Sequence, residues 1–194
     1  MTYTINLRAF THSISDRELL QLSSENPDYR LETNADGKLI VMAPTGSESG
    51  EKNAELIYQV KAWNIKSGKP GKVFDSSAGF KLSNGAVRSP DVSWIAMGKW
   101  NSLTREQKRK FAPIDPDFVI ELMSPTDEYR ETQQKMLEYM NCGVKLGWLI
   151  NPDVGVVEIY RIGKKTQVLK NPVSLSGEDI LPNLIVNLED IFDS

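Results

Sequence analysis

The chain has 194 residues, and its 40% hydrophobic and 25% charged content is typical of a folded globular protein with a core of its own. A net charge of −3 argues against a strongly basic nucleic-acid coat, because lysine and arginine supply most of the non-specific affinity for phosphates. No apolar run approaches the roughly 18 residues of a membrane helix, and the N-terminus lacks the pattern of a secretory signal. We therefore expect a cytoplasmic protein with no membrane partner.

Two scarce residue types limit the chemistry that the chain can carry out. His12 and Cys142 are the single histidine and the single cysteine. A lone cysteine cannot form an intrachain disulfide, and one residue of each type cannot make a zinc site unless carboxylates supply the other ligands. A serine or cysteine nucleophile would have to use His12, yet no G-x-S-x-G motif accompanies it. Catalysis would therefore depend on carboxylates, lysines and hydroxyls, which favours a hard cation with oxygen ligands.

The first half of the chain alternates helix and strand patterns. A capping box at Ser15–Glu18 begins a short helix, and Leu56, Val60 and Trp63 recur at the spacing of a helix that buries one face. Alternating apolar residues bounded by turn residues predict strands. The expected elements are a helix to about Ser24, a hairpin of Tyr29–Thr33 and Lys38–Ala43, a helix over 49–66, and strands at Lys72–Asp75, Ala78–Leu82 and Val87–Ala96.

The second half begins with a polar segment, 102–111, which we expect to be a helical insertion. Phe118–Leu122 is a continuous apolar run with one carboxylate, as expected of a central strand. Ser124 or Thr126 can cap the next helix, which runs to about Asn141. The remaining elements are strands at Leu146–Asn151 and Val156–Tyr160, a further strand after Thr166, and a short terminal helix. Without repeats or long linkers, residues 1–194 are expected to form one α/β domain around a mixed sheet, preceded by a hairpin.

Two carboxylates stand out because of their neighbours. Asp91 follows Pro90 at the start of an apolar strand, and Glu121 lies inside the apolar run Phe118–Leu122. Burying a lone carboxylate costs several kcal/mol unless it is paired or bound to a metal. Glu121 could instead point to solvent at the strand end or form a salt bridge. The pair is the candidate metal site.

A third candidate comes from the helix that follows. Glu128, Glu131, Lys135 and Glu138 share one helix face. Lys135 could form an ordinary surface ion pair with Glu131, or it could reach back over the strand end toward Asp91 and Glu121. The sequence leaves these alternatives open.

Two further surface features have alternative explanations. Five basic residues cluster in the segment 99–110, where they form either a basic patch or a solvated helix face: Lys99, Arg105, Lys108, Arg109 and Lys110. Four tryptophans and exposed strand edges make a homodimer plausible, although buried core positions explain most of the tryptophans equally well: Trp63, Trp94, Trp100 and Trp148.

Several blocks of sequence together resemble the Uma2 family, also called DUF820, of the PD-(D/E)XK restriction-endonuclease-like superfamily. The likeness spans Tyr29 to Leu188. It rests on Pro90–Asp91, Val119–Pro125, Lys135–Tyr139 and Gly147–Pro152. The resemblance implies a restriction-endonuclease-like αβββαβ core with a mixed central sheet, here carrying an N-terminal helix and hairpin.

The resemblance also implies roles for particular residues. Asp91 and Glu121 would hold Mg²⁺, with Mn²⁺ as a substitute, for hydrolysis of phosphodiester bonds in DNA. The lysine expected two positions after Glu121 is replaced by Met123, and Lys135 on the following helix is the matching position. Glu55, or Glu51 one turn earlier, would complete the metal shell. The displaced lysine and the acidic charge also fit an alternative: a binding or scaffold protein that keeps the nuclease fold with weak or no activity.

Overall fold

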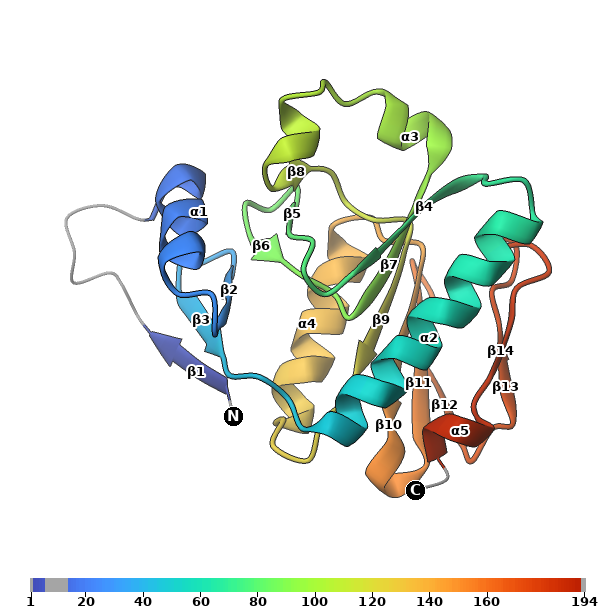
Figure 1. Cartoon of the computed structure of the whole chain (residues 1–194). Coiled ribbons are helices and arrows are strands. Elements are labelled where there is room, and N and C mark those ends of the chain that lie inside the picture. The colour runs from blue at the N-terminus through green and yellow to red at the C-terminus, as the bar shows by residue number, and fades with distance from the viewer. Residues whose placement is uncertain (1, 6–13, 193–194) are drawn as a thin grey trace.

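The computed structural model describes residues 2–5 and 14–192, so His12 lies outside the described residues. Its mixed α/β architecture contains two six-stranded sheets and a two-stranded sheet among the described residues. Figure 1 shows the larger body of the molecule beside a smaller unit made of the N-terminal helix and hairpin. No helix in the described part of the chain is long and apolar enough to cross a membrane.

The central sheet has the strand order β12-β11-β10-β9-β7-β4. Its strands are β4 (Gly71–Asp75), β7 (Val92–Ala96), β9 (Phe118–Leu122), β10 (Leu146–Asn151), β11 (Val156–Arg161) and β12 (Gln167–Lys170). β9 and β10 are parallel and the other pairs are antiparallel. A parallel pair needs a crossover, which α4 (Tyr129–Asn141) supplies. The carboxyl ends of β9 and β10 therefore lie at the same edge as the start of β7.

Two helices cover the central sheet from opposite faces. α2 (Ser47–Lys66) packs Leu56, Val60 and Trp63 against one face, as the helical spacing predicts. α4 packs Met136 and Tyr139 against the other face. Every residue of β9 is buried, because a central strand covered on both faces has no contact with water. A charged side chain in β9 is therefore held among protein atoms.

The second sheet joins the N-terminal unit to the body. Its order is β1-β3-β2-β6-β5-β8: β1 (Thr2–Ile5), β3 (Leu39–Met42), β2 (Arg30–Thr33), β6 (Val87–Arg88), β5 (Phe80–Lys81) and β8 (Ala112–Pro113). The predicted capping box at Ser15 is present at the start of α1 (Asp16–Glu25). α1, the hairpin β2–β3 and β6 share a small core of Leu19, Leu31, Leu39 and Val87. The hairpin is thereby placed beside the carboxyl edge of the central sheet.

The prediction of one strand over Val87–Ala96 is wrong. The segment divides into β6 and β7, which belong to different sheets, and the break falls at Ser89–Asp91. Pro90 explains the break, because proline cannot donate a hydrogen bond to a ladder. Asp91 consequently lies at the junction of the two sheets.

Two predicted helix boundaries also need correction. Residues 102–111 do not form a helix: α3 (Met97–Asn101) precedes them, and they contain one short 3₁₀ helix (Gln107–Arg109). Few apolar residues in this segment can pack on the body, so a helix here would lack tertiary support. α4 begins after Glu128, not at Ser124 or Thr126, because the Ser124 backbone and hydroxyl instead donate to Asp127 within a turn.

The C-terminal segment contains more strands than the sequence predicts. The remaining elements are a 3₁₀ helix (Pro152–Val154), a two-stranded sheet of β13 (Ser174–Ser176) and β14 (Ile185–Asn187), and α5 (Glu189–Phe192). The predicted strand Ala78–Leu82 is shortened to β5. Trp63, Trp94 and Trp148 are buried in the core against the central sheet, so their presence does not require a dimer.

Candidate active site

Asp91 and Glu121 face each other at the carboxyl edge of the central sheet. β7 and β9 pair with Val92 opposite Ile120, so one further step of the register places Asp91 opposite Glu121. Residues directly opposite in an antiparallel pair point to the same face. The Asp91 carboxylate also accepts a hydrogen bond from the backbone N–H of Leu122, 2.9 Å away. Both predicted carboxylates therefore lie at one end of β9.

Glu121 is buried, with 4% of its surface exposed, and does not point to solvent. Its Oε1 lies 2.9 Å from the Nζ of Lys135 and accepts a hydrogen bond from the Tyr139 hydroxyl at 2.8 Å. Burial raises the pKa of Glu121 to about 7; Asp91 and Glu32 reinforce the shift, and Lys135 opposes it. This carboxyl can therefore gain or lose a proton near neutral pH.

Lys135 reaches back over the strand end and does not form the surface pair with Glu131. Its Nζ lies between Glu121 and Glu32, at 2.9 and 3.2 Å. Burial alone would lower the pKa of Lys135, but the two carboxylates outweigh it and raise the pKa. Lys135 is therefore a largely buried ammonium, with a side chain 13% exposed, held at the carboxyl end of β9.

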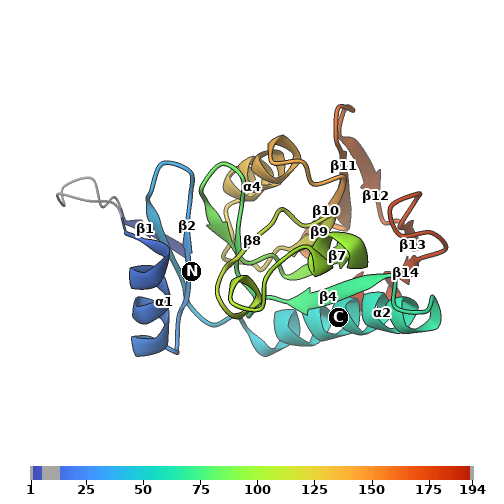
Figure 2. The ribbon, with the colours of Figure 1, turned by 90° about the horizontal axis from the view of Figure 1, so that it is seen from above.

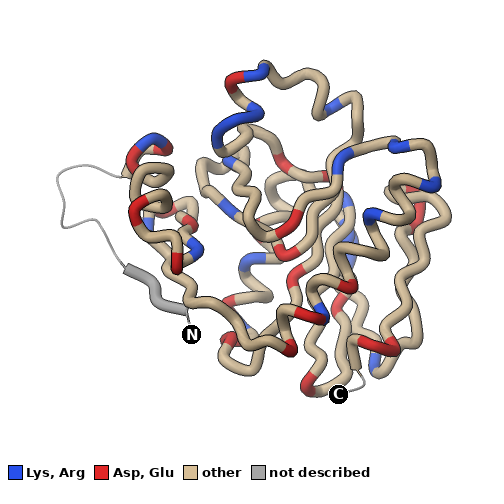
Figure 3. Tube along the Cα trace, viewed as in Figure 1, with Lys and Arg blue, Asp and Glu red and all other residues tan. Residues whose placement is uncertain are grey.

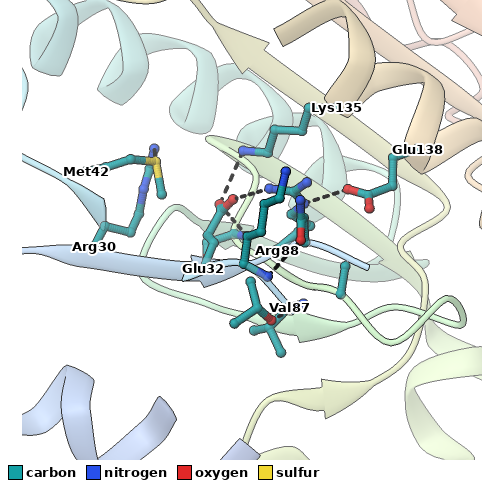
Figure 4. Close-up of polar contacts among 12 residues, drawn as sticks. Arg30, Glu32, Met42, Val87, Arg88, Lys135 and Glu138 are labelled. Carbon is teal, nitrogen blue, oxygen red and sulfur yellow. Dashed lines mark hydrogen bonds and ion pairs between the residues drawn. The ribbon is translucent and has the colours of Figure 1, made fainter. Parts of the chain in front are cut away.

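Glu32 of β2 is a site residue that the sequence did not reveal. Its carboxylate, 1% exposed, accepts hydrogen bonds from Lys135, Arg88 and the backbone N–H of Ser89 (Figure 4). Burial would raise the pKa of Glu32, but Lys135, Arg88 and Arg30 together lower it to about 2. Glu32 is thus an anion at neutral pH and a second carboxylate in contact with Lys135.

Two arginines complete the charge network. Arg30 donates to Oδ1 of Asp91 at 3.1 Å, the oxygen that does not accept from Leu122. Arg88 forms ion pairs with Glu32, at 3.1 Å, and with Glu138 of α4, at 2.6 Å. Arg88 therefore ties the hairpin to α4 through a buried ion pair with Glu32 and a partly buried one with Glu138 (Figure 4).

We expect Arg88→Met to destabilise the protein by about 3 kcal/mol, because it leaves the buried Glu32 and the partly buried Glu138 without their shared cation. Urea denaturation followed by circular dichroism measures the change. The matched control is Lys110→Met, which removes an exposed i,i+4 pair with Glu106 and should not change the midpoint measurably. Equal midpoints for both variants would show that Arg88 does not anchor the hairpin.

These side chains line a cleft of about 1040 Å³ between the N-terminal unit and the body. Its walls come from the hairpin, the first turns of α2, the loop after β4, the carboxyl end of β9 and the outer face of α4. In Figure 2, viewed from above, the hairpin lies to the left of α4 and β9. The acidic helix face that the sequence predicted, Glu128, Glu131 and Glu138 with Lys135, lines the α4 wall.

The donor set suits Mg²⁺ with a small number of protein ligands. No three His, Cys, Asp or Glu side chains in the described ranges are grouped to hold a metal ion. Mg²⁺ commonly uses one or two carboxylates and keeps several waters, so Asp91 and Glu121 suffice in number and type. Their oxygens contact Arg30, Lys135 and Tyr139, and a cation would take the place of these donors.

The structure does not bring Glu55 into the cleft. Ser49 and Asn53 are the α2 residues that line it, whereas Glu55 and Glu51 do not. Successive residues of a helix are rotated by about 100° about its axis. Glu55, two positions after Asn53, is rotated by about 200° and therefore points to nearly the opposite side of the helix from the cleft. Glu55 is therefore left out of the site proposed below.

The model of the Uma2 family, described as "Putative restriction endonuclease", matches residues 16–189. The chain belongs to the Uma2 family. The matched range contains every residue of the Uma2 cleft described above, including Glu32, Asp91, Glu121 and Lys135.

A solved structure shares the fold of this Uma2 chain. It is a protein from Anabaena variabilis ATCC 29413, described as a "putative nuclease belonging to DUF820". The two are 24% identical, the alignment covers 92% of this chain and 97% of that one, and the TM-score is 0.74. At this identity the likeness shows that the two chains share a fold. The comparison with curated proteins gives no match.

Proposed function

We propose that this Uma2 protein is a metal-dependent endonuclease that hydrolyses phosphodiester bonds of DNA in the cleft. The observation that supports this most strongly is the convergence of Asp91, Glu121 and Lys135. Lys135 contacts Glu121, and Asp91 hydrogen-bonds the residue after Glu121. Two carboxylates and a lysine, from the β6–β7 junction, β9 and α4, thereby meet at one strand end.

Asp91 and Glu121 would hold Mg²⁺ or Mn²⁺, with the Leu122 carbonyl as a third oxygen. When bound, the cation would polarise the scissile phosphodiester and lower the pKa of a bound water. Lys135 would orient the attacking water and balance the negative charge that develops on the phosphate oxygens. Because burial makes such an interaction stronger than in water, a lysine with 13% exposure is well suited to this task.

Glu32 has a positioning role in this proposal. It accepts from Lys135 at 3.2 Å and stays ionised, because its pKa is lowered to about 2. If a cation takes over Glu121, Glu32 still keeps the Lys135 ammonium protonated and fixed. Arg30, released from Asp91 by the same cation, is placed in the cleft wall to contact a phosphate.

The raised pKa of Glu121 predicts a pH-dependent metal site. A proton and a cation compete for this carboxylate, so affinity for Mn²⁺ should fall about tenfold between about pH 8 and pH 6. Calorimetric titration across this range measures it. An affinity that stays constant over this range would contradict the assignment of Glu121.

The pH dependence of stability in the metal-free protein tests the same raised pKa. Metal affinity should rise with pH, whereas the contribution of Glu121 to stability should fall. Neutral Glu121 favours folding, so its contribution is complete below the ordinary pKa of 4.5 and is lost as pH rises through about 7. Glu121→Gln should remove that part of the pH dependence of unfolding.

Nicking of supercoiled plasmid tests the proposed activity. We expect open-circular product with Mg²⁺ or Mn²⁺ and none with EDTA. The opposing candidate, a nuclease-fold binding protein without activity, is favoured by one observation: Arg30 and Lys135 already neutralise both carboxylates. Metal binding without nicking at any pH would support that candidate.

A further inference from the structure

The charges of this protein are separated between the cleft and another face. Nine acidic and four basic residues line the cleft. In contrast, segments 66–74 and 97–111 carry eight basic residues and one acidic residue, Glu106, although the whole chain has a net charge of −3. Figure 3 shows lysine and arginine concentrated over the loops at the top of the molecule.

The two basic segments lie side by side. β4 pairs with β7, and the backbone N–H of Met97, at the start of α3, donates to the carbonyl of Pro70 at 2.8 Å. Lys69 and Lys72 therefore lie beside α3 and the segment 102–111 that follows it. We call this region the upper basic surface and define it by Lys66, Lys69, Lys72, Arg105, Lys108 and Arg109.

The side chains of the upper basic surface are available to an anionic partner. Lys66, Lys69, Lys72, Arg105 and Arg109 are exposed, and no acidic side chain in the described ranges pairs with them. The Lys108 ammonium lies over the Trp100 ring, 5.4 Å from its centre. Packing onto this tryptophan holds the segment against the body and keeps its charge at the surface.

Both basic segments lead into the rim of the cleft. Ser76 and Ser77, which follow β4, line the cleft, and so does Phe111, which follows Lys110. Phe111 also packs against the hairpin core. A polymer of phosphates lying across the upper basic surface would therefore continue into the cleft where Asp91 and Glu121 lie.

We propose that the upper basic surface is the docking site for the phosphate backbone of double-stranded DNA. The cleft, with nine acidic residues against four basic ones, attracts a phosphate backbone less than the upper basic surface does, because phosphates are neutralised by lysine and arginine. In this proposal the upper basic surface binds the duplex, and the cleft binds the metal ion. This proposal rests on the proposed nuclease function for its choice of DNA, but binding can be measured without cleavage.

The experiment uses a fluorescent DNA duplex of about 30 base pairs in EDTA, with anisotropy recorded as salt is raised. The triple variant Lys72→Gln, Arg105→Gln, Arg109→Gln should bind at least about tenfold more weakly, and the slope of log affinity against log salt should fall by about 0.9 for each lost phosphate contact. The matched control is Lys164→Gln, Lys165→Gln, Lys170→Gln at the opposite edge of the sheet, where the same charge change should leave binding unchanged.

Equal weakening in both triple variants, or no duplex binding by the wild type, would overturn the proposal. Binding of phosphatidylserine vesicles in place of duplex would overturn it in favour of a membrane surface. The nuclease proposal fails separately, when wild-type protein binds duplex in EDTA yet does not nick plasmid with Mg²⁺ or Mn²⁺.

Discussion

Asp91→Asn is expected to lower the rate of metal-dependent plasmid nicking by at least about 100-fold, equivalent to about 2.7 kcal/mol of transition-state stabilisation. The substitution keeps the shape of the side chain and an oxygen that can accept from the Leu122 N–H. It removes the negative charge that would hold the cation. Affinity for Mn²⁺, measured by calorimetry, should fall at least about tenfold, or 1.4 kcal/mol.

Asp127→Asn is the matched control for this result. Asp127 also lines the cleft, and its carboxylate accepts from the backbone N–H of Ser124, so the two substitutions change similar interactions. We expect its nicking rate to stay within about twofold of the wild type, because a charge outside the metal shell is screened by solvent. Wild-type nicking by Asp91→Asn would contradict the assignment of Asp91, and equal losses in both variants would indicate a general effect of cleft charge.

Lys135→Met is expected to reduce nicking by about 100-fold or more while Mn²⁺ binding at high pH is retained. The lysine contacts Glu121 and Glu32 and would stabilise charge during the reaction, but it would not be a metal ligand. Its removal also takes away the ammonium that competes with the cation for Glu121. The split between activity and metal binding separates this variant from Asp91→Asn, in which both are lost.

Two further variants make the Lys135 result interpretable. Lys38→Met removes another lysine from the cleft lining and should leave nicking within about twofold of the wild type, because Lys38 is not placed at the carboxylates. Lys135→Arg keeps the charge and should recover part of the lost rate. If Lys135→Met also loses Mn²⁺ binding, its role is to maintain the site and not to assist the reaction.

Glu121 and Asp91 could be found in the sequence because both interrupt apolar strands. A carboxylate inside Phe118–Leu122 requires a partner, and the Pro90–Asp91 step marks the end of a ladder. The same Pro90 should have divided the predicted strand Val87–Ala96. Lys135 was found through family resemblance, because helix spacing alone left it equally able to pair with Glu131.

Glu32 could not be found because its environment is created by tertiary structure. In Arg30–Thr33 the alternation of charged and apolar residues is the pattern of a hairpin with one face in water. Leu31 does pack in the small core with α1, but the opposite face of β2 meets α4 and the end of β9 across the cleft. Nothing local distinguishes a solvent-facing glutamate from one that faces another part of the fold. The polar segment 102–111 lacks the predicted helix for a different reason: few of its residues are apolar, so a helix there would have little tertiary support.

Mn²⁺ soaked into crystals at about pH 8, where Glu121 is ionised, offers the most direct test of the central claim. Anomalous diffraction locates the ion without assumptions about activity. We predict one Mn²⁺ bound by carboxylate oxygens of both Asp91 and Glu121, with Lys135 still held by Glu32. An ordered ion elsewhere in the cleft, or no ion at saturating Mn²⁺, would contradict the assignment of these two carboxylates as the metal site.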